Sequence, residues 1–417
     1  NQKNNYLRKS KNSHTMRRTL ALVIIILWAG ELAFAVRNRP VASVPFEMVG
    51  SFVVINVSVN GSGRLRFILD TGVRNTIITE LHAEDSVDLE YSRMRELQGL
   101  GSGNVMNAYV SDGNTFQLNR KFKLSNRSVF VLTDDIFNLS RQTGSKINGI
   151  AGADFFANHV VAIDYSRRRL RFYDPATFVA PDDFGVMPMT LEGQKMYLHL
   201  SVLETEEELR TIKMLIDTGA ELTAWFQTLT NNAVRIPQKS VKGRIGEGLS
   251  GEVTGIYTRV PQICIANYCV RNPVVVFPDP QSIAGIIRDT DRDGTIGGQL
   301  LRRFNVIIDT HHRKFYFKPN AYFKKEFKYN VAGLEVVQAT NGIPQFEVIH
   351  VWDESPAARA GLRDGDMITA IDGQNVFSMT LAEMRAVFEK SSSRALRIKV
   401  QRESKMLDFE LDMKPRI

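Results

Sequence analysis

Residues 66–78 read RFILDTGVRNTII and residues 213–225 read KMLIDTGAELTAW, so one motif occurs twice in this chain of 417 residues. In each copy an Asp-Thr-Gly triplet follows an apolar, strand-like run. The triplets begin at Asp70 and Asp217, which are 147 positions apart. An isolated Asp-Thr-Gly is most often a turn with Asx-type bonding. Two copies in the same context indicate a repeat instead.

Two further matches extend the repeat toward the C-terminus. Residues 149–156 (GIAGADFF) match 294–301 (GTIGGQLL), and residues 161–172 (VAIDYSRRRLRF) match 306–317 (VIIDTHHRKFYF). These later copies are offset by 145 positions, so a short insertion or deletion separates otherwise parallel halves. A repeat of this length is too long for a solenoid unit and indicates a duplicated domain.

Both halves are predicted to be mainly β. Runs rich in Val and Ile, such as 52–59, are bounded by Gly, Asn or Pro and are typical of strands. Only short helices are expected, for example at 154–157 and 299–303, each just after a glycine. We therefore expect two pseudo-symmetric β lobes, residues 36–185 and 186–325.

The basic charge of the chain is concentrated at its N-terminus. The formal net charge is +8, and residues 1–35 carry six Lys or Arg against one Glu. The remainder has no clustered basic patch, so nucleic-acid binding is not expected. From Met16, a basic start, an apolar run and small residues around Ala35 are typical of a signal peptide. This segment is 16–35, and residues 1–15 would lie upstream of the true start.

The predicted leader implies export, with the periplasm or cell envelope as the expected location. The alternative is an uncleaved membrane anchor, although the apolar run 20–29 is about half the ~20 residues that a spanning helix needs. Cys264 and Cys269 agree with export. In a hairpin that turns at Ala266 and Asn267 they face each other, and in an oxidising compartment they are either a disulfide or two free thiols.

The duplicated motif resembles the aspartic proteases in their bilobal, pepsin-like form, with a retropepsin-like Asp-Thr-Gly-Ala in the second copy. The resemblance covers residues 45–320. It implies an aspartic endopeptidase with the catalytic residues Asp70 and Asp217 in the cleft between the lobes, and it implies no metal and no cofactor. The same resemblance implies supporting roles for four neighbours, of which the threonines cross-bond beneath the carboxylates and the glycines present backbone N–H groups to them. They are Thr71, Gly72, Thr218 and Gly219.

The chemistry of such a pair follows from electrostatics. Two carboxylates about 3 Å apart cannot both ionise, so they share one proton. The ionised partner can take a proton from water while the protonated partner donates to the scissile carbonyl oxygen.

The chain departs from the family pattern after each triplet. Val73 and Ala220 stand where pepsin-like enzymes usually have Ser or Thr. Ala is familiar from retropepsins, but the bulk of Val73 is an argument for an inactive first half. One alternative is therefore a catalytically inactive adaptor that binds extended peptides without cutting them. Another keeps the catalysis but pairs each lobe with its twin in a homodimer.

Two glycine-rich stretches, 99–103 and 243–248, stand where a hairpin flap covers the substrate in that family. The alternative is that both are ordinary mobile loops. Leu100 stands where pepsin-like flaps often carry Tyr. The residues expected to form the flap are Gly99, Leu100, Gly101, Gly246 and Gly248.

Residues 326–417 form a third module of different character. The stretch 355–366 (SPAARAGLRDGD) resembles that of a PDZ domain, which is a small β-barrel with two helices. The resemblance implies a peptide C-terminus as a partner, bound as an added strand, besides a peptide or protein substrate for the lobes. Glu335 places a negative charge near that anionic end, so a structural or regulatory role is the alternative. The expected carboxylate-binding loop is Gly333, Leu334, Glu335 and Val336.

Overall fold

The computed structural model describes residues 39–97, 99, 106–135, 137–205, 208–230, 232–248, 250–287, 291–340 and 343–417. Strands make up 49% and helices 10%, which confirms the expectation of a mainly β protein. The predicted leader lies outside the described residues. Within the described ranges, no helix is both long and apolar enough to cross a membrane.

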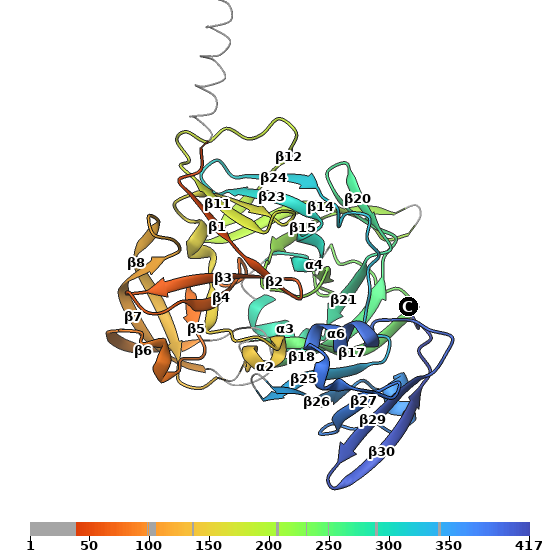
Figure 1. Cartoon of the computed structure of the whole chain (residues 1–417). Coiled ribbons are helices and arrows are strands. Elements are labelled where there is room, and N and C mark those ends of the chain that lie inside the picture. The colour runs from red at the N-terminus through yellow and green to blue at the C-terminus, as the bar shows by residue number, and fades with distance from the viewer. Residues whose placement is uncertain are drawn as a thin grey trace, which may run out of the picture.

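The first sheet comes from the first copy of the repeat and lies at the left of Figure 1. Its strands follow the order β2-β3-β4-β9-β5-β8-β7-β6, and β3 also pairs with β7. The strands are β2 (Glu47–Val49), β3 (Phe52–Val59), β4 (Leu65–Leu69), β5 (Thr76–Ile78), β6 (Tyr91–Leu97), β7 (Met106–Gln117), β8 (Lys123–Leu132) and β9 (Gly149–Ala151).

The second sheet comes from the second copy. Its order is β17-β18-β21-β16-β22-β15-β14-β19-β20, with β13 paired to β14. The strands are β13 (Thr190–Glu192), β14 (Lys195–Leu203), β15 (Leu209–Ile216), β16 (Ala224–Phe226), β17 (Ser240–Gly248), β18 (Gly251–Arg259), β19 (Gln262–Ile265), β20 (Tyr268–Arg271), β21 (Val274–Pro278) and β22 (Gly294–Ile296).

The two sheets share the same connectivity at their centres. In the first sheet β9 runs parallel to β4 and antiparallel to β5, and β5 runs parallel to β8. In the second sheet β22 runs parallel to β15 and antiparallel to β16, and β16 runs parallel to β21. The sequence repeat is therefore a structural repeat.

A third sheet is built from both copies and joins them, at the top of Figure 1. At its centre β10 pairs antiparallel with β23, with Ala162 opposite Ile307 and with Val161 opposite Ile308. Because positions 162 and 307 are equivalent in the repeat, a local two-fold axis passes between them. The strands are β1 (Ala42–Pro45), β10 (Val160–Asp164), β11 (Arg169–Tyr173), β12 (Gly185–Pro188), β23 (Phe304–Asp309) and β24 (Lys314–Pro319).

The C-terminal module has its own sheet, drawn in blue in Figure 1, with the order β25-β26-β27-β29-β30 and β28 paired to β27. Ser355 caps the helix α5 (Pro356–Ala360) by accepting from the N–H of Ala358, and Gly361 ends the helix at φ 94°. The strands are β25 (Leu334–Thr340), β26 (Ile343–Val351), β27 (Met367–Ile371), β28 (Gln374–Asn375), β29 (Leu396–Arg402) and β30 (Lys405–Leu411).

The helices of the described residues are short. The 3₁₀ segments are η1 (Ala83–Asp85), η2 (Ala153–Phe156) and η3 (Val376–Ser378). The α-helices are α2 (Leu139–Thr143), α3 (Pro280–Ile287), α4 (Gly298–Leu301), α5 (Pro356–Ala360) and α6 (Leu381–Phe388).

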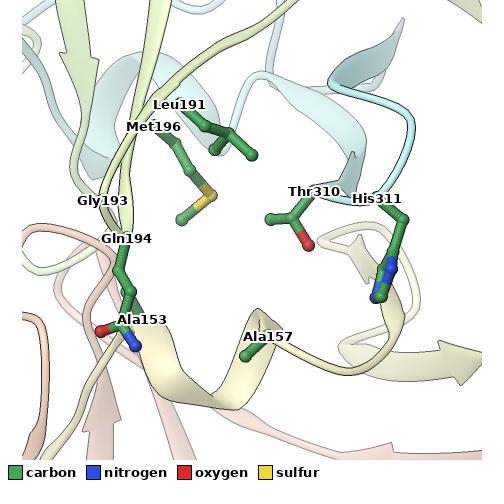
Figure 2. Close-up of a pocket in the computed structure, with 8 residues that line it drawn as sticks. All are labelled: Ala153, Ala157, Leu191, Gly193, Gln194, Met196, Thr310 and His311. Carbon is green, nitrogen blue, oxygen red and sulfur yellow. The ribbon is translucent and has the colours of Figure 1, made fainter.

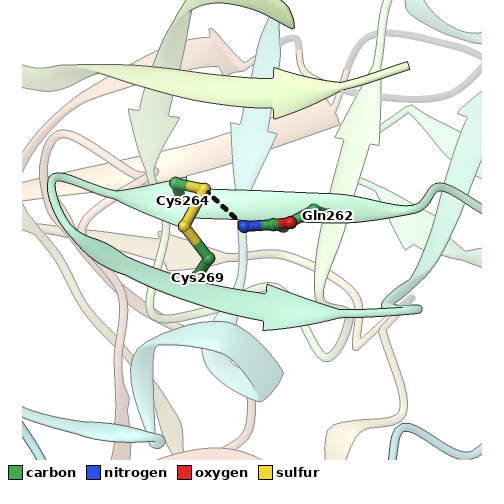
Figure 3. The surroundings of a disulfide bond; sticks show 3 residues. All are labelled: Gln262, Cys264 and Cys269. Carbon is green, nitrogen blue, oxygen red and sulfur yellow. Dashed lines mark hydrogen bonds between the residues drawn. A yellow bond between two sulfur atoms is a disulfide. The ribbon is translucent and has the colours of Figure 1, made fainter. Parts of the chain in front are cut away.

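A disulfide closes the β19–β20 hairpin (Figure 3). The strands pair Ile265 with Tyr268 and Cys264 with Cys269, and Ala266 in the turn has φ 49°. The side chain of Gln262 donates a hydrogen bond to the sulfur of Cys264 (3.2 Å).

Candidate active site

Asp70 and Asp217 occupy equivalent places at the ends of equivalent strands. Asp70 follows β4, and its backbone N–H donates to the carbonyl of Ala151 in β9 (2.8 Å). Asp217 follows β15, and its N–H donates to the carbonyl of Ile296 in β22 (3.0 Å). The parallel pairing in each sheet thus sets both aspartate backbones in the same way.

The threonines of the two triplets bond to each other across the two sheets. The N–H of Thr71 donates to the hydroxyl of Thr218, and the N–H of Thr218 donates to the hydroxyl of Thr71 (both 3.1 Å). Each hydroxyl in turn donates to a backbone carbonyl of the opposite sheet. Thr71 donates to Ile216 and Thr218 donates to Leu69 (both 2.7 Å). Both threonines are 1% exposed, so these four bonds are made away from water.

The glycines of the triplets bring each loop against the opposite carboxyl group. A Cβ atom on Gly72 would lie 2.6 Å from Oδ2 of Asp217, and one on Gly219 would lie 2.2 Å from Cγ of Asp70. No side chain fits at either position. The two carboxyl groups are also hydrogen-bonded to each other.

Backbone N–H groups bind the outer sides of both carboxyl groups. Oδ1 of Asp70 accepts from Gly72 (2.7 Å) and Val73 (3.2 Å), and Oδ1 of Asp217 accepts from Gly219 (2.9 Å). The backbone of Val73 therefore holds Asp70. The side chain of Val73 packs against the small apolar cluster that includes Ile77, which accommodates its bulk.

Electrostatics make the two carboxyl groups unequal. Burial raises the pKa of Asp70 well above its ordinary value of 3.8, and the charge of Asp217 raises it further. Burial also raises the pKa of Asp217, but the hydrogen bond with Asp70 and the positive charge of Arg292 oppose that rise. These influences favour the proton on Asp70 and the negative charge on Asp217.

Arg292 is a site residue that the sequence reasoning missed. It is 3% exposed, and its guanidinium carbon lies 5.0 Å from the centre of the Trp225 ring. Its Nε has no hydrogen-bond partner among the described residues. In the sequence it stands between Asp291 and Asp293, a pattern typical of a solvated acidic segment, so no local signal marks it as buried.

Two hairpins, one from each copy of the repeat, contact each other. The hairpin β6–β7 includes Gly99, whose N–H donates to the hydroxyl of Ser250 at the turn of β17–β18 (3.1 Å). Gly246 and Gly248 lie in β17, just after a register shift that follows Arg244. Leu100 and Gly101 lie outside the described residues.

The predicted carboxylate-binding loop of the C-terminal module contacts the hairpin β17–β18. Arg244 of β17 pairs with Glu335 (3.0 Å), which also accepts from Nε1 of Trp352 (2.8 Å). The Trp352 ring stacks on Tyr257 of β18, with ring centres 4.7 Å apart. Gly333, at φ 64°, precedes β25, which begins with Leu334, Glu335 and Val336.

Two cavities lie away from the carboxyl pair. One, of about 230 Å³, is lined by the segment around η2, by the β13–β14 hairpin with Leu191 and Met196, and by the β23–β24 turn with Thr310 and His311 (Figure 2). The other, of about 480 Å³, is lined by residues that include Lys213. Within the described ranges, no three or more His, Cys, Asp or Glu side chains gather in a way that could hold a metal ion.

Comparison with known families gives one match. Residues 348–402 match the PDZ domain, which confirms the predicted nature of the C-terminal module. No curated protein matches the chain. The chain therefore carries a PDZ domain, which indicates peptide recognition or regulation.

Replacing Thr218 with Val should destabilise the protein strongly. The N–H of Thr71 and the carbonyl of Leu69 would both lose a buried partner, and each such loss costs about 1–3 kcal/mol. We expect the free energy of unfolding to fall by roughly 2–5 kcal/mol in chemical denaturation. Thr258→Val is the matched control, because Thr258 is equally buried but, among the described residues, its side chain bonds only to the carbonyl of Lys239, just before β17. Equal losses in the two variants would contradict a special role for the crossed bonds.

Replacing Asp154 with Asn should stabilise the protein at neutral but not at acidic pH. Burial raises the pKa of Asp154 to about 6, against 3.8 ordinarily. Because the folded state holds the proton more tightly, stability is lost as pH rises from about 4 through about 6. Asn cannot ionise, so we expect a gain of about 1–3 kcal/mol near pH 8 and little change near pH 4. Denaturation at the two pH values measures this, and a pH-independent difference would count against it.

Proposed function

We propose that the chain is an exported aspartic endopeptidase with a bilobal, pepsin-like fold and a regulatory or peptide-binding PDZ domain. The single observation that carries the proposal is the mutual contact of Asp70 and Asp217, each under the other loop's glycine. The crossed threonine bonds support the same interpretation, as does the symmetric pairing of β10 with β23 in the shared sheet.

The unequal pKa shifts support an assignment of roles. Asp217, the partner that carries the charge, would take a proton from a water molecule as that water attacks the scissile carbonyl carbon. Asp70, the partner that carries the proton, would donate it to the carbonyl oxygen. The products of that step are a neutral tetrahedral diol and a pair that still holds one proton. Collapse of the diol with protonation of the amine then gives the two peptide fragments.

Hydrolysis by this route needs a cover that excludes bulk water. The contact between Gly99 and Ser250 supports a cover formed by both hairpins, since each copy of the repeat contributes one of the two residues. Export is supported by the disulfide between Cys264 and Cys269, which is a bond typical of oxidising compartments.

The second candidate function is an adaptor that binds peptides without cutting them. The PDZ match favours peptide recognition, and Val73 departs from the usual protease pattern. Against this candidate, the backbone of Val73 still donates to Asp70, and its side chain packs among apolar neighbours. A test for turnover separates the two candidates.

Asp70→Asn and Asp217→Asn should each abolish peptide cleavage. Each removes a group that moves a proton in the chemical step, so we expect kcat/KM to fall by roughly 10²–10⁴-fold or more on a library of internally quenched peptides. Asp134→Asn, a change at another aspartate, is the control, and circular dichroism checks that every variant is folded. Wild-type rates in either catalytic variant would overturn the proposal, and a wild-type chain without turnover would favour the adaptor.

The pH profile should be bell-shaped and sensitive to Arg292. Because the pKa of Asp70 and that of Asp217 are both raised above 3.8, we expect both limbs at higher pH than that value. Arg292 lowers the pKa of Asp217, so Arg292→Gln should move the acidic limb to higher pH. Steady-state kinetics across pH measure this shift, with Arg93→Gln as the control at an exposed arginine. An unmoved acidic limb would show that Arg292 does not tune the pair.

A further inference from the structure

The outer edge of β25 in the PDZ domain faces another part of the same chain. β25 is the last strand of its sheet and pairs with β26 on one side. On the other side it contacts α6 of its own domain and α2, a helix of the first repeat copy (Figure 1). A PDZ domain takes up a peptide as a strand added to the edge of its sheet. In this chain the corresponding groove lies between β25 and α6.

Residues 139–144, which comprise α2 and the glycine that follows it, make polar contacts with both walls of that groove. Arg141 donates to the carbonyl of Gln338 in β25 (3.1 Å) and pairs with Glu347 in β26 (2.7 Å). From the opposite wall, Arg385 of α6 donates to the carbonyl of Gln142 (2.7 Å). The same nitrogen of Arg385 also reaches the carbonyl of Val336 in β25 (3.4 Å). One guanidinium group thus joins both walls to the inserted segment.

The end of this segment fits closely against α6. Gly144 lies in the left-handed region at φ 66°, where glycine is favoured. A Cβ atom there would lie 2.9 Å from Cβ of Leu381 and 3.1 Å from Oε1 of Gln338. The segment therefore ends in the one residue that leaves room for both walls.

The carboxylate-binding end of the groove is already engaged within the chain. The N–H groups of Gly333 and Leu334 both donate to the side-chain oxygen of Asn330 (2.9 and 3.4 Å). Glu335 adds a negative charge, which Arg244 and Trp352 hold. A free C-terminal carboxylate would meet an occupied pair of donors and a like charge, whereas an internal segment such as 139–144 brings no terminal charge.

We propose that residues 139–144 are an intramolecular occupant of the PDZ groove, and that an external peptide binds there only by displacing them. The ligand class of this domain is an internal peptide segment with an Arg side chain that can reach Glu347. Tethering makes the closed form favourable although both side chains of its ion pair are 34% exposed, because the segment and the groove belong to one chain and have a high effective concentration.

The test uses a fluorescein-labelled peptide with the sequence of residues 137–146 and an amidated C-terminus, titrated against the full chain by fluorescence anisotropy. All proteins carry Asp70→Asn, so that the readout does not depend on the proposed hydrolysis and the probe is not consumed. In the chain, Arg141→Glu places a negative charge beside Glu347, and the repulsion between the two should open the groove. The probe keeps its own Arg.

We expect Arg141→Glu to bind the probe at least tenfold more tightly than the parent chain. Arg93→Glu, which breaks an exposed ion pair with Asp112 in the first sheet, is the matched control and should bind like the parent. The double variant Arg141→Glu/Glu347→Arg restores the ion pair with reversed charges, and its affinity should return to the weak parental value.

Amide hydrogen exchange of the same proteins tests whether each variant is still folded. Amides of β25 should exchange at least tenfold faster in Arg141→Glu, while amides of β29 and β30 should keep their protection because the domain remains folded. The proposal is overturned if Arg141→Glu, with β29 and β30 still protected, binds the probe no more tightly than the parent chain. It is equally overturned if the charge-swapped variant stays as open as Arg141→Glu.

Discussion

Two carboxyl groups that touch away from bulk water can coexist only if they share a proton and if the backbone holds them together. In this protein the crossed bonds of Thr71 and Thr218 supply that restraint, because each threonine is anchored to the sheet of the other. The restraint works only if the loops approach closely. Gly72 and Gly219 permit this approach, since a Cβ atom at either position would collide with the opposite carboxyl group. The symmetric register of β10 and β23 sets the same two-fold relation at the level of the sheets.

The symmetry of the backbone does not extend to the charges. Arg292 lies on the side of Asp217 and has no cationic counterpart among the groups that shift the pKa of Asp70. On the other side, Asp70 has a neighbour, Val73, that packs among apolar residues. A symmetric pair would leave the position of the proton undecided, whereas this arrangement favours Asp70 as its holder. The proposed division of roles between acid and base therefore depends on residues outside the repeated triplets.

The sequence was sufficient to identify the repeat and the two aspartates, because they are carried by local patterns that occur twice. The mainly β character and the PDZ domain could also be predicted, the latter from residues 355–366 alone. The place of Arg292 in the site could not be predicted, because its burial against Trp225 depends on contacts between residues far apart in the sequence. The same holds for Arg141, an ordinary polar residue of a short helix whose partners lie about 200 positions further along the chain.

The glycine-rich stretch 243–248 shows why composition alone does not assign a role to each glycine. A Cβ atom on Gly243 would lie 2.5 Å from the Trp352 ring, so this glycine serves packing against the PDZ domain. Gly246 has open space around it, and it follows the register shift of β17. The hairpin is therefore packed against the PDZ domain at Gly243, whereas Gly246 has no neighbour that would exclude a side chain. Since the same domain also contacts α2 and, through Arg385, the Glu221 that follows the second triplet, its position constrains elements of both repeat copies at once.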